Sequence, residues 1–185
     1  MQKFRKWLEE NSMVTMIAVI LVIGGCLFYI YRSTTDSRGA ALGSAYYLDR
    51  NTGKLYVDDR NALPPLETSS GDYQGEPAGV RAYVFACGDY ESSYAGMTIE
   101  EVQQSGAHVT ALMKYTPAAI QAMLAYQEDD SNPDYAAMDQ RLLCAPGSEE
   151  WVTPAQSRGL ERATTAPRLN CGDGEEVLMA FPGGR

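Results

Sequence analysis

A run of nineteen residues without a charged side chain, residues 13–31, constrains this chain more than any other feature. At about 1.5 Å of rise per helical residue, the run spans roughly 28 Å, close to the hydrocarbon thickness of a bilayer. Trp7 lies before the run, and Tyr29 and Tyr31 lie at its far end, where interfacial aromatic side chains are enriched. The run therefore predicts a transmembrane helix, which follows a short juxtamembrane segment at residues 1–12.

Two other interpretations of this run are a cleaved signal peptide and a lipoprotein anchor. A signal peptide has an apolar region of about 7–15 residues and then a small-residue cleavage site. Here the run is longer and ends in Tyr-Ile-Tyr-Arg. Residues 23–26, Ile-Gly-Gly-Cys, loosely resemble a lipobox, but apolar residues follow Cys26 where polar residues are usual. A retained helix is the favoured interpretation.

The charges before the run predict its orientation. Lys3, Arg5 and Lys6 precede it, and positive charges close to a span stay on the cytoplasmic side. Long domains that follow a span are translocated largely regardless of their charge. We therefore expect a cytoplasmic N-terminus and an extracytoplasmic, periplasmic domain. The sequence has no N-glycosylation acceptor, which favours a bacterial membrane over a eukaryotic one.

The residues beyond position 32 are strongly acidic, with eleven basic and twenty-two acidic side chains and no basic patch. This balance excludes nucleic acid as a primary partner. It also predicts that the domain stands off anionic lipid headgroups, so that membrane lipid is contacted through residues 13–31 alone. We expect a protein partner in the envelope and no cofactor or metal, and the oligomeric state stays open.

The outer region is predicted to be one small α+β domain. Residues 32–44 are small and polar and form a linker to a domain at residues 45–185. Residues 45–58 predict an antiparallel hairpin around the turn Arg50-Asn-Thr-Gly53. Alternating apolar residues predict a central strand at 80–87 and another strand at 107–115.

Two or three short helices are expected between and after these strands. Thr98 and Glu101 form a capping box that opens the first, and Thr116 followed by proline opens the second. The second helix has a stripe of Ile120, Met123 and Leu124, which predicts that it covers one face of the sheet. Residues 168–171 and 177–181 are predicted to form a final hairpin around the turn at 172–174.

Four cysteines and one histidine are the candidates for special chemistry. Cys144 and Cys171 each end a predicted strand and are the favoured disulfide pair, which would leave Cys87 as a buried thiol. A metal site of Cys87, Cys144, Cys171 and His108 is disfavoured, because these residues lack the close cysteine pair of structural zinc sites. A nucleophile pair of Cys87 and His108 is a further alternative, although no catalytic signature surrounds it.

In its organisation the chain resembles small uncharacterised bacterial single-pass envelope proteins. The features that carry the resemblance are the basic start KFRKW, the uncharged span and an outer domain that opens with YYLDRNTGKLYV. The resemblance implies a membrane-anchored envelope protein and no particular activity. Its only specific motif is the hairpin sequence DRNTGKLY.

The sequence favours a non-enzymatic protein that binds or scaffolds another component of a membrane-associated assembly. An anchored enzyme that uses Cys87 and His108 is one alternative, and a tethered cell-wall or carbohydrate-binding module is another. A helix contact in the bilayer is predicted at the small residues Gly24, Gly25 and Cys26. Outside the membrane, the irregular segment with Pro64, Pro65 and Tyr73 is the predicted partner loop, and a mobile loop beside a lone anchor helix is the alternative.

Overall fold

The computed structural model describes residues 21–26, 43–88, 93–129, 133–172 and 174–183. The chain divides into two compact units, Met1–Ala40 and Ala41–Arg185. In the first unit the structure describes a helical segment at residues 21–26, so most of the predicted span at 13–31 lies outside the described residues. Within the described part of the chain, no helix combines the length and the apolar character that a membrane crossing requires.

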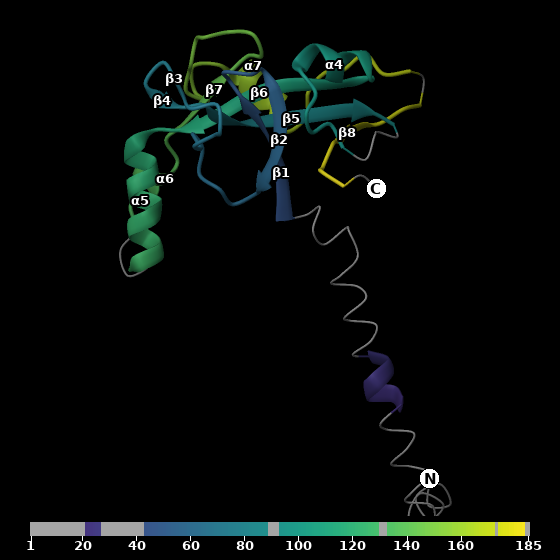
Figure 1. The fold of residues 1–185 in the computed structure, drawn as a ribbon, viewed down its shortest axis with the longest axis horizontal. Coiled ribbons are helices and arrows are strands. Elements are labelled where there is room, and N and C mark those ends of the chain that lie inside the picture. The colour runs from purple at the N-terminus through teal and green to yellow at the C-terminus, as the bar shows by residue number, and fades with distance from the viewer. Residues whose placement is uncertain (1–20, 27–42, 89–92, 130–132, 173, 184–185) are drawn as a thin grey trace, which may run out of the picture. The chain divides into compact units, whose positions relative to one another are not determined.

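The second unit is mixed α+β and is built on an antiparallel sheet, as the sequence predicts (Figure 1). The strands run in the order β2-β1-β5-β6-β7, and β8 also pairs with β5. Their bounds are β1 Ser44–Asp49, β2 Lys54–Asp59, β5 Gly79–Cys87, β6 Ala107–Tyr115, β7 Arg141–Cys144 and β8 Val177–Met179. A separate small ribbon pairs β3 Asp72–Tyr73 with β4 Glu76–Pro77.

The central strand β5 has neighbours along both edges. It pairs with β6 along residues 81–86 on one edge. On its other edge β1 covers residues 79–81 and β8 covers residues 85–87. The edge opposite β6 is therefore shared between a strand that precedes β5 in the sequence and one that follows it by about ninety residues.

One face of the sheet carries the hydrophobic core. Every second residue of β5 points into it, and α4 Ile99–Gln104 covers it with Val102, which is fully buried. The capping box predicted at the start of α4 is present, because Thr98 and Glu101 each accept a hydrogen bond from the other's backbone N–H. The core consists of Tyr46, Leu48, Leu55, Val80, Ala82, Val84, Ala86, Tyr94, Val102, Ala107, Val109, Leu112, Cys144 and Ala180.

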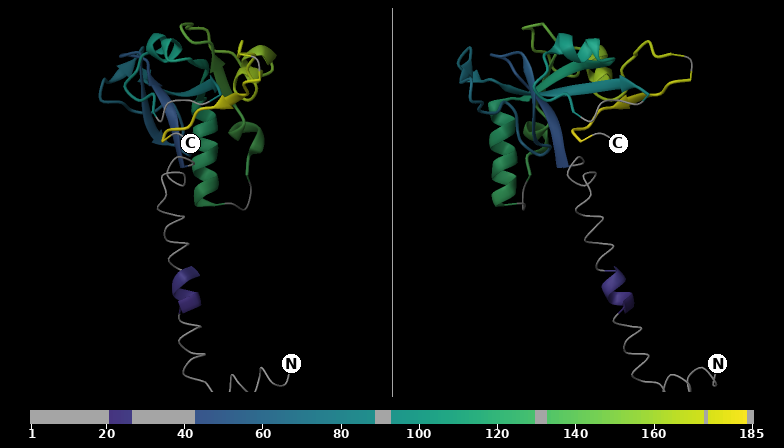
Figure 2. Two further views of the ribbon diagram at one scale, coloured as in Figure 1. Left: turned by 90° about the vertical axis from the view of Figure 1, so that its right-hand side faces the viewer. Right: turned by 45° about the vertical axis from the view of Figure 1, so that its right-hand side comes forward.

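The hairpin predicted from the sequence is confirmed, with Tyr47 opposite Tyr56. The helix predicted after Thr116 is confirmed as α5 Pro117–Glu128, but its predicted packing is wrong. Figures 1 and 2 show α5 extending away from the sheet, beside α6 Tyr135–Met138, and not across a face of the sheet. Leu124 is 49% exposed, and Ala119 is the one buried residue of α5. Four of its twelve residues are alanines, which offer little apolar surface, so the apolar stripe is too weak to bind this helix to the sheet.

The predicted final hairpin is also wrong. Residues 168–171 form no strand, and β8 pairs with β5 instead of with them. The reason is that β1 leaves half of one edge of β5 unpaired, and the backbone groups of a buried central strand require hydrogen-bond partners. This docking of β8 also brings the preceding segment to the end of β5.

The stacked pair Tyr47 and Tyr56 predicts a loss of stability at alkaline pH. Their ring centroids are 5.7 Å apart, and burial raises the pKa of each to about 12. Because these folded-state pKa values exceed the unfolded value of about 10, their contribution is complete below pH 10 and is lost as pH rises toward 12. We expect the urea midpoint to fall over that range, and to fall less in the variant Tyr47→Phe/Tyr56→Phe. An equal fall in both proteins would contradict this assignment.

Candidate functional site

The disulfide of this domain joins Cys87 to Cys171, with 5.4 Å between their Cα atoms. The predicted pair of Cys144 and Cys171 is therefore wrong. Cys87 is the last residue of β5, and the segment before β8 passes the same end of the sheet. Cys144 lies two strands away on β7 and faces the core, where Cys171 does not reach.

Cys144 is a buried free thiol that donates toward the carbonyl oxygens of Ser148 and Ala145, at 3.0 and 3.3 Å. Burial raises the pKa of this thiol, which keeps it protonated and unreactive at neutral pH. In the variant Cys26→Ser, Cys144 becomes the one free cysteine. We expect a maleimide probe to label this variant only after unfolding in urea, as measured by mass spectrometry. Rapid labelling of the folded protein would contradict the burial of Cys144.

The disulfide bears on two alternatives from the sequence analysis, the nucleophile pair of Cys87 and His108 and the metal site of three cysteines and His108. The Cys87 sulfur is held in a disulfide, so it is not a thiolate that could act as a nucleophile with His108. The same bond removes Cys87 and Cys171 from the four-residue metal set. Within the described ranges, His, Cys, Asp and Glu side chains form no group that could hold a metal ion.

The predicted partner loop, which contains Pro64, Pro65 and Tyr73, makes contacts with the rest of the domain. Pro64 is buried and precedes Pro65 through a cis peptide bond, and the Pro64 carbonyl accepts from the Tyr115 N–H at 2.8 Å. The Arg50 guanidinium lies 4.0 Å from the centre of the Tyr73 ring, and the Tyr73 hydroxyl donates to Glu149 at 2.8 Å. These contacts occupy Tyr73 within the domain. A partner contact here and the mobile-loop alternative both stay predictions.

The predicted helix contact at Gly24, Gly25 and Cys26 lies in the described segment at residues 21–26. All three residues are exposed there. A Cβ atom added at either glycine would meet nothing within 4 Å. Leucine would therefore fit at both positions within this unit, and the role of these residues in a helix contact stays a prediction.

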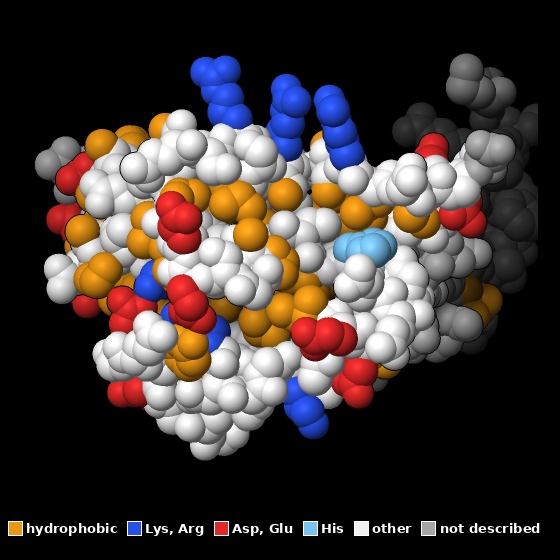
Figure 3. Space-filling model, turned by 90° about the horizontal axis from the view of Figure 1, so that it is seen from above, with side chains coloured by type: hydrophobic (Ala, Val, Ile, Leu, Met, Phe, Trp, Pro, Cys, Tyr) orange, Lys and Arg blue, Asp and Glu red, His pale blue; other side chains and the backbone are white. Residues whose placement is uncertain are grey.

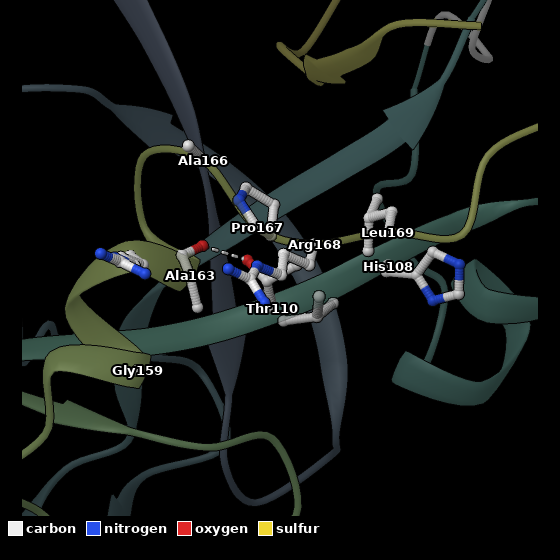
Figure 4. A pocket seen from close by; sticks show the side chains of 10 residues that line it. His108, Thr110, Gly159, Ala163, Ala166, Pro167, Arg168 and Leu169 are labelled. Carbon is white, nitrogen blue, oxygen red and sulfur yellow. Dashed lines mark hydrogen bonds between the residues drawn. The ribbon is translucent and has the colours of Figure 1, made fainter.

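A pocket of about 560 Å³ lies beside the first half of β6 and is called the β6 pocket from here on. Its walls come from β6, from α7 Arg158–Ala163 and from the segment at residues 166–169, as Figure 4 shows. Its volume is within the range of natural ligand sites. The lining residues are His108, Val109, Thr110, Gly159, Arg162, Ala163, Ala166, Pro167, Arg168 and Leu169.

A β-bulge in β6 shapes the floor of the β6 pocket. Tyr83 of β5 pairs with Ala111 and Val84 pairs with Val109, so Thr110 is the extra residue. The Thr110 hydroxyl lies 2.6 Å from the carbonyl oxygen of Ala163, to which it donates (dashed line in Figure 4). The bulge thereby connects the end of α7 to β6. Bulges commonly redirect side chains beside functional sites.

The β6 pocket is cationic in a domain that is otherwise acidic. Arg162, Arg168 and His108 line it, and none of the aspartates and glutamates that the structure describes does. The two ion pairs of the described residues, Arg50 with Glu149 and Lys114 with Glu76, involve neither of these arginines. The space-filling view from above shows the histidine, in pale blue, at a hollow, with basic side chains standing free along one edge (Figure 3).

This arrangement can bind an anionic group. A guanidinium offers a planar set of N–H donors that matches the oxygens of a carboxylate or a phosphate. Arg162 and Arg168 are exposed side chains with no carboxylate neighbour in the pocket lining to neutralise them. The lining also includes Val109, Ala166 and Pro167, which add apolar surface to the pocket. The pocket therefore combines positively charged side chains with apolar wall surface.

The sequence analysis did not identify Arg162, Arg168 or Thr110. A signal for the arginines was present, because residues 158–168 contain three arginines and one glutamate in a domain where acids outnumber bases. No comparable signal marked the bulge at Thr110, which depends on the register between β5 and β6. No family model, curated protein or solved structure matches this chain. The function of the pocket is consequently inferred from its own residues.

Proposed function

We propose that this chain is a membrane-anchored, non-enzymatic binding protein of the bacterial envelope, whose outer domain holds an anionic group of a partner in the β6 pocket. The observation that carries the proposal is that Arg162 and Arg168 both line a pocket to which no carboxylate of the described residues contributes. Both arginines are exposed, so a ligand can reach their guanidinium groups. A bound carboxylate or phosphate would accept charge-assisted hydrogen bonds from them.

The location of the domain is part of the proposal. The uncharged run at residues 13–31 and the basic residues before it support a single-pass anchor with a cytoplasmic N-terminus. The Cys87–Cys171 disulfide independently supports an oxidising compartment for the outer domain, because such bonds are rare in a reducing cytosol. Both observations favour a periplasmic domain.

A binding role is favoured over catalysis by the contents of the β6 pocket. The lining residues include one imidazole and one hydroxyl, and the Thr110 hydroxyl donates to the Ala163 carbonyl. An activated nucleophile needs an adjacent base within hydrogen-bond reach, and no such pair is found among the lining residues. The pocket can therefore bind a ligand through its positive charge and its shape.

The proposal is tested with the full chain in a neutral detergent, using glutarate and inorganic phosphate as probes. Nuclear magnetic resonance titration is expected to shift the backbone signals of Val109, Thr110 and residues 162–168 in a saturable manner. The variant Arg162→Gln/Arg168→Gln should weaken binding by at least about tenfold, the equivalent of about 1.4 kcal/mol.

A matched control is Arg158→Gln, since Arg158 is an exposed arginine of the same helix that does not line the pocket. It removes one positive charge, where the paired variant removes two. A general charge effect would therefore give the control about half of the paired variant's loss in binding free energy, and we expect much less than that. Saturable shifts at the pocket that the paired variant leaves unchanged would refute the proposal.

A further inference from the structure

Within the part of the chain that the structure describes, the edge of β6 that borders the β6 pocket has no partner strand. β7 pairs with β6 at residues 112–115 only, and the chain leaves the sheet after Cys144. Among the described residues, nothing pairs with β6 on this side at residues 107–109. An unpaired strand edge presents backbone donors and acceptors at the spacing that another strand requires.

The backbone groups of Val109 point into this open edge. The Val84 carbonyl accepts from the Ala180 N–H at 2.9 Å, so the peptide groups of Val84 face β8 and not β6. Val109 is directly opposite Val84, and in an antiparallel ladder such a pair either exchanges hydrogen bonds or turns its groups outward on both sides. The N–H and C=O of Val109 therefore point away from β5.

The side chain of Val109 supports the same conclusion. It belongs to the hydrophobic core and is 8% exposed, yet Val109 lines the β6 pocket. Because the side chain is packed in the core, we infer that Val109 lines the pocket mainly with its backbone. Ala107 is opposite Ala86 and has the same orientation, because the residues of a strand alternate. Ala107 is fully buried and does not line the pocket, so Val109 is the residue of this stretch whose outward groups a ligand could reach.

The bulge at Thr110 separates this free stretch from the stretch that β7 covers. Leu143 exchanges two hydrogen bonds with Val152, so the neighbours of Leu143 face β6 and pair with Leu112 and Lys114. The backbone N–H and C=O groups of β6 that point away from β5 therefore belong to residues 112 and 114 on one side of Thr110. On the other side of Thr110 they belong to residues 107 and 109. Because the extra residue breaks the regular spacing, β7 cannot continue past it and the pocket stays open.

We propose that the occupant of the β6 pocket is an extended acidic peptide segment of a protein partner, which adds a strand to β6 beyond the end of β7. This inference rests on the proposed function and names the class of ligand. Val109 would exchange main-chain hydrogen bonds with the peptide, and Arg162 and Arg168 would pair with its carboxylates. Strand addition to an open edge is an established mode of peptide recognition.

The walls of the pocket suit an extended chain better than a small anion. Figure 4 shows Ala163 near one end of the β6 wall, Arg168 along its length and His108 near the other end. A carboxylate alone can satisfy the arginines, but it has no donor for the Val109 carbonyl. A peptide offers both a donor and an acceptor at every second residue. Pro167, on the facing wall, has no N–H and does not compete for this edge.

The test compares four ligands on the full chain in a neutral detergent. The parent ligand is the peptide acetyl-Val-Glu-Val-Glu-Val-amide, and glutarate is the small-anion reference. Two further peptides carry N-methyl groups, either on all valines or on both glutamates, with the side chains unchanged. In an added strand only every second N–H faces β6, so one set of methyl groups blocks the pairing and the other set points away.

We expect the parent peptide to bind at least about tenfold more tightly than glutarate, and one of the two methylated peptides to lose that advantage. Amide exchange at Val109 should slow with the parent peptide and not with glutarate. If glutarate binds and the parent peptide binds no better, or if both methylated peptides behave alike, strand addition is wrong while the anion site stands. If neither glutarate nor the peptide binds, the proposed function fails as well.

Discussion

Removal of the Cys87–Cys171 disulfide is expected to lower the free energy of unfolding by about 4–5 kcal/mol. The bond spans a sequence separation of 84 residues, and a loop of this size is worth about 4.6 kcal/mol in the chain-entropy model. A small domain has a total stability of about 5–15 kcal/mol, so the loss is a large share of it. The measurement is urea unfolding of the full chain in detergent, followed by far-ultraviolet circular dichroism, with and without reductant.

The control is the variant Cys87→Ser/Cys171→Ser, which should unfold at the same urea concentration with and without reductant. This comparison separates the disulfide from other effects of the reducing agent. An unreduced wild-type protein that unfolds at the same urea concentration as the double variant would show that the bond contributes nothing to stability.

Replacement of Gly79 by alanine is expected to destabilise the domain by about 3 kcal/mol, at the upper end of overpacking costs. An added Cβ would lie 2.1 Å from the Tyr56 hydroxyl oxygen and 2.9 Å from the Leu66 carbonyl oxygen. Gly79 also exchanges two backbone hydrogen bonds with Leu66, of 2.7 and 2.9 Å, so neither β5 nor the segment around Leu66 can move away freely. Urea unfolding of the variant gives the measurement.

A second substitution tests the mechanism. The Tyr56 hydroxyl is buried without a hydrogen-bond partner, so Tyr56→Phe alone should cost little. In the pair Gly79→Ala/Tyr56→Phe the closest contact is gone, and we expect recovery of part of the lost stability. Gly43→Ala is the matched control, because a Cβ there meets nothing within 4 Å. A Gly79→Ala protein as stable as the Gly43→Ala protein would contradict the packing described for β5.

Local features of the fold could be predicted from the sequence. The hairpin of β1 and β2, the capping box of α4, the start of α5 and the bounds of β6 each depend on residues within about ten positions of one another. Turn residues, helix caps and alternating apolar residues report such short-range structure directly. These predictions are confirmed for that reason.

The incorrect predictions all concern contacts between parts of the chain that are distant in the sequence. The partner of Cys171 depends on the edge of β5 that β8 joins, and no pattern near either cysteine carries this information. The packing of α5 depends on which surfaces remain uncovered once the sheet is assembled. The β6 pocket requires the strand order, the short length of β7 and the bulge at Thr110 together.

The division of one edge of β5 between β1 and β8 has a consequence for the newly made chain. β1 precedes β5, but β8 follows it by about ninety residues, which takes roughly 5–18 s at a synthesis rate of 5–20 residues per second. During that delay the edge of β5 at residues 85–87 is open, and Cys87 has no partner. An open edge of an apolar strand can pair with other chains. The domain is therefore most exposed to aggregation and to incorrect cysteine pairing in the interval before Cys171 and β8 arrive.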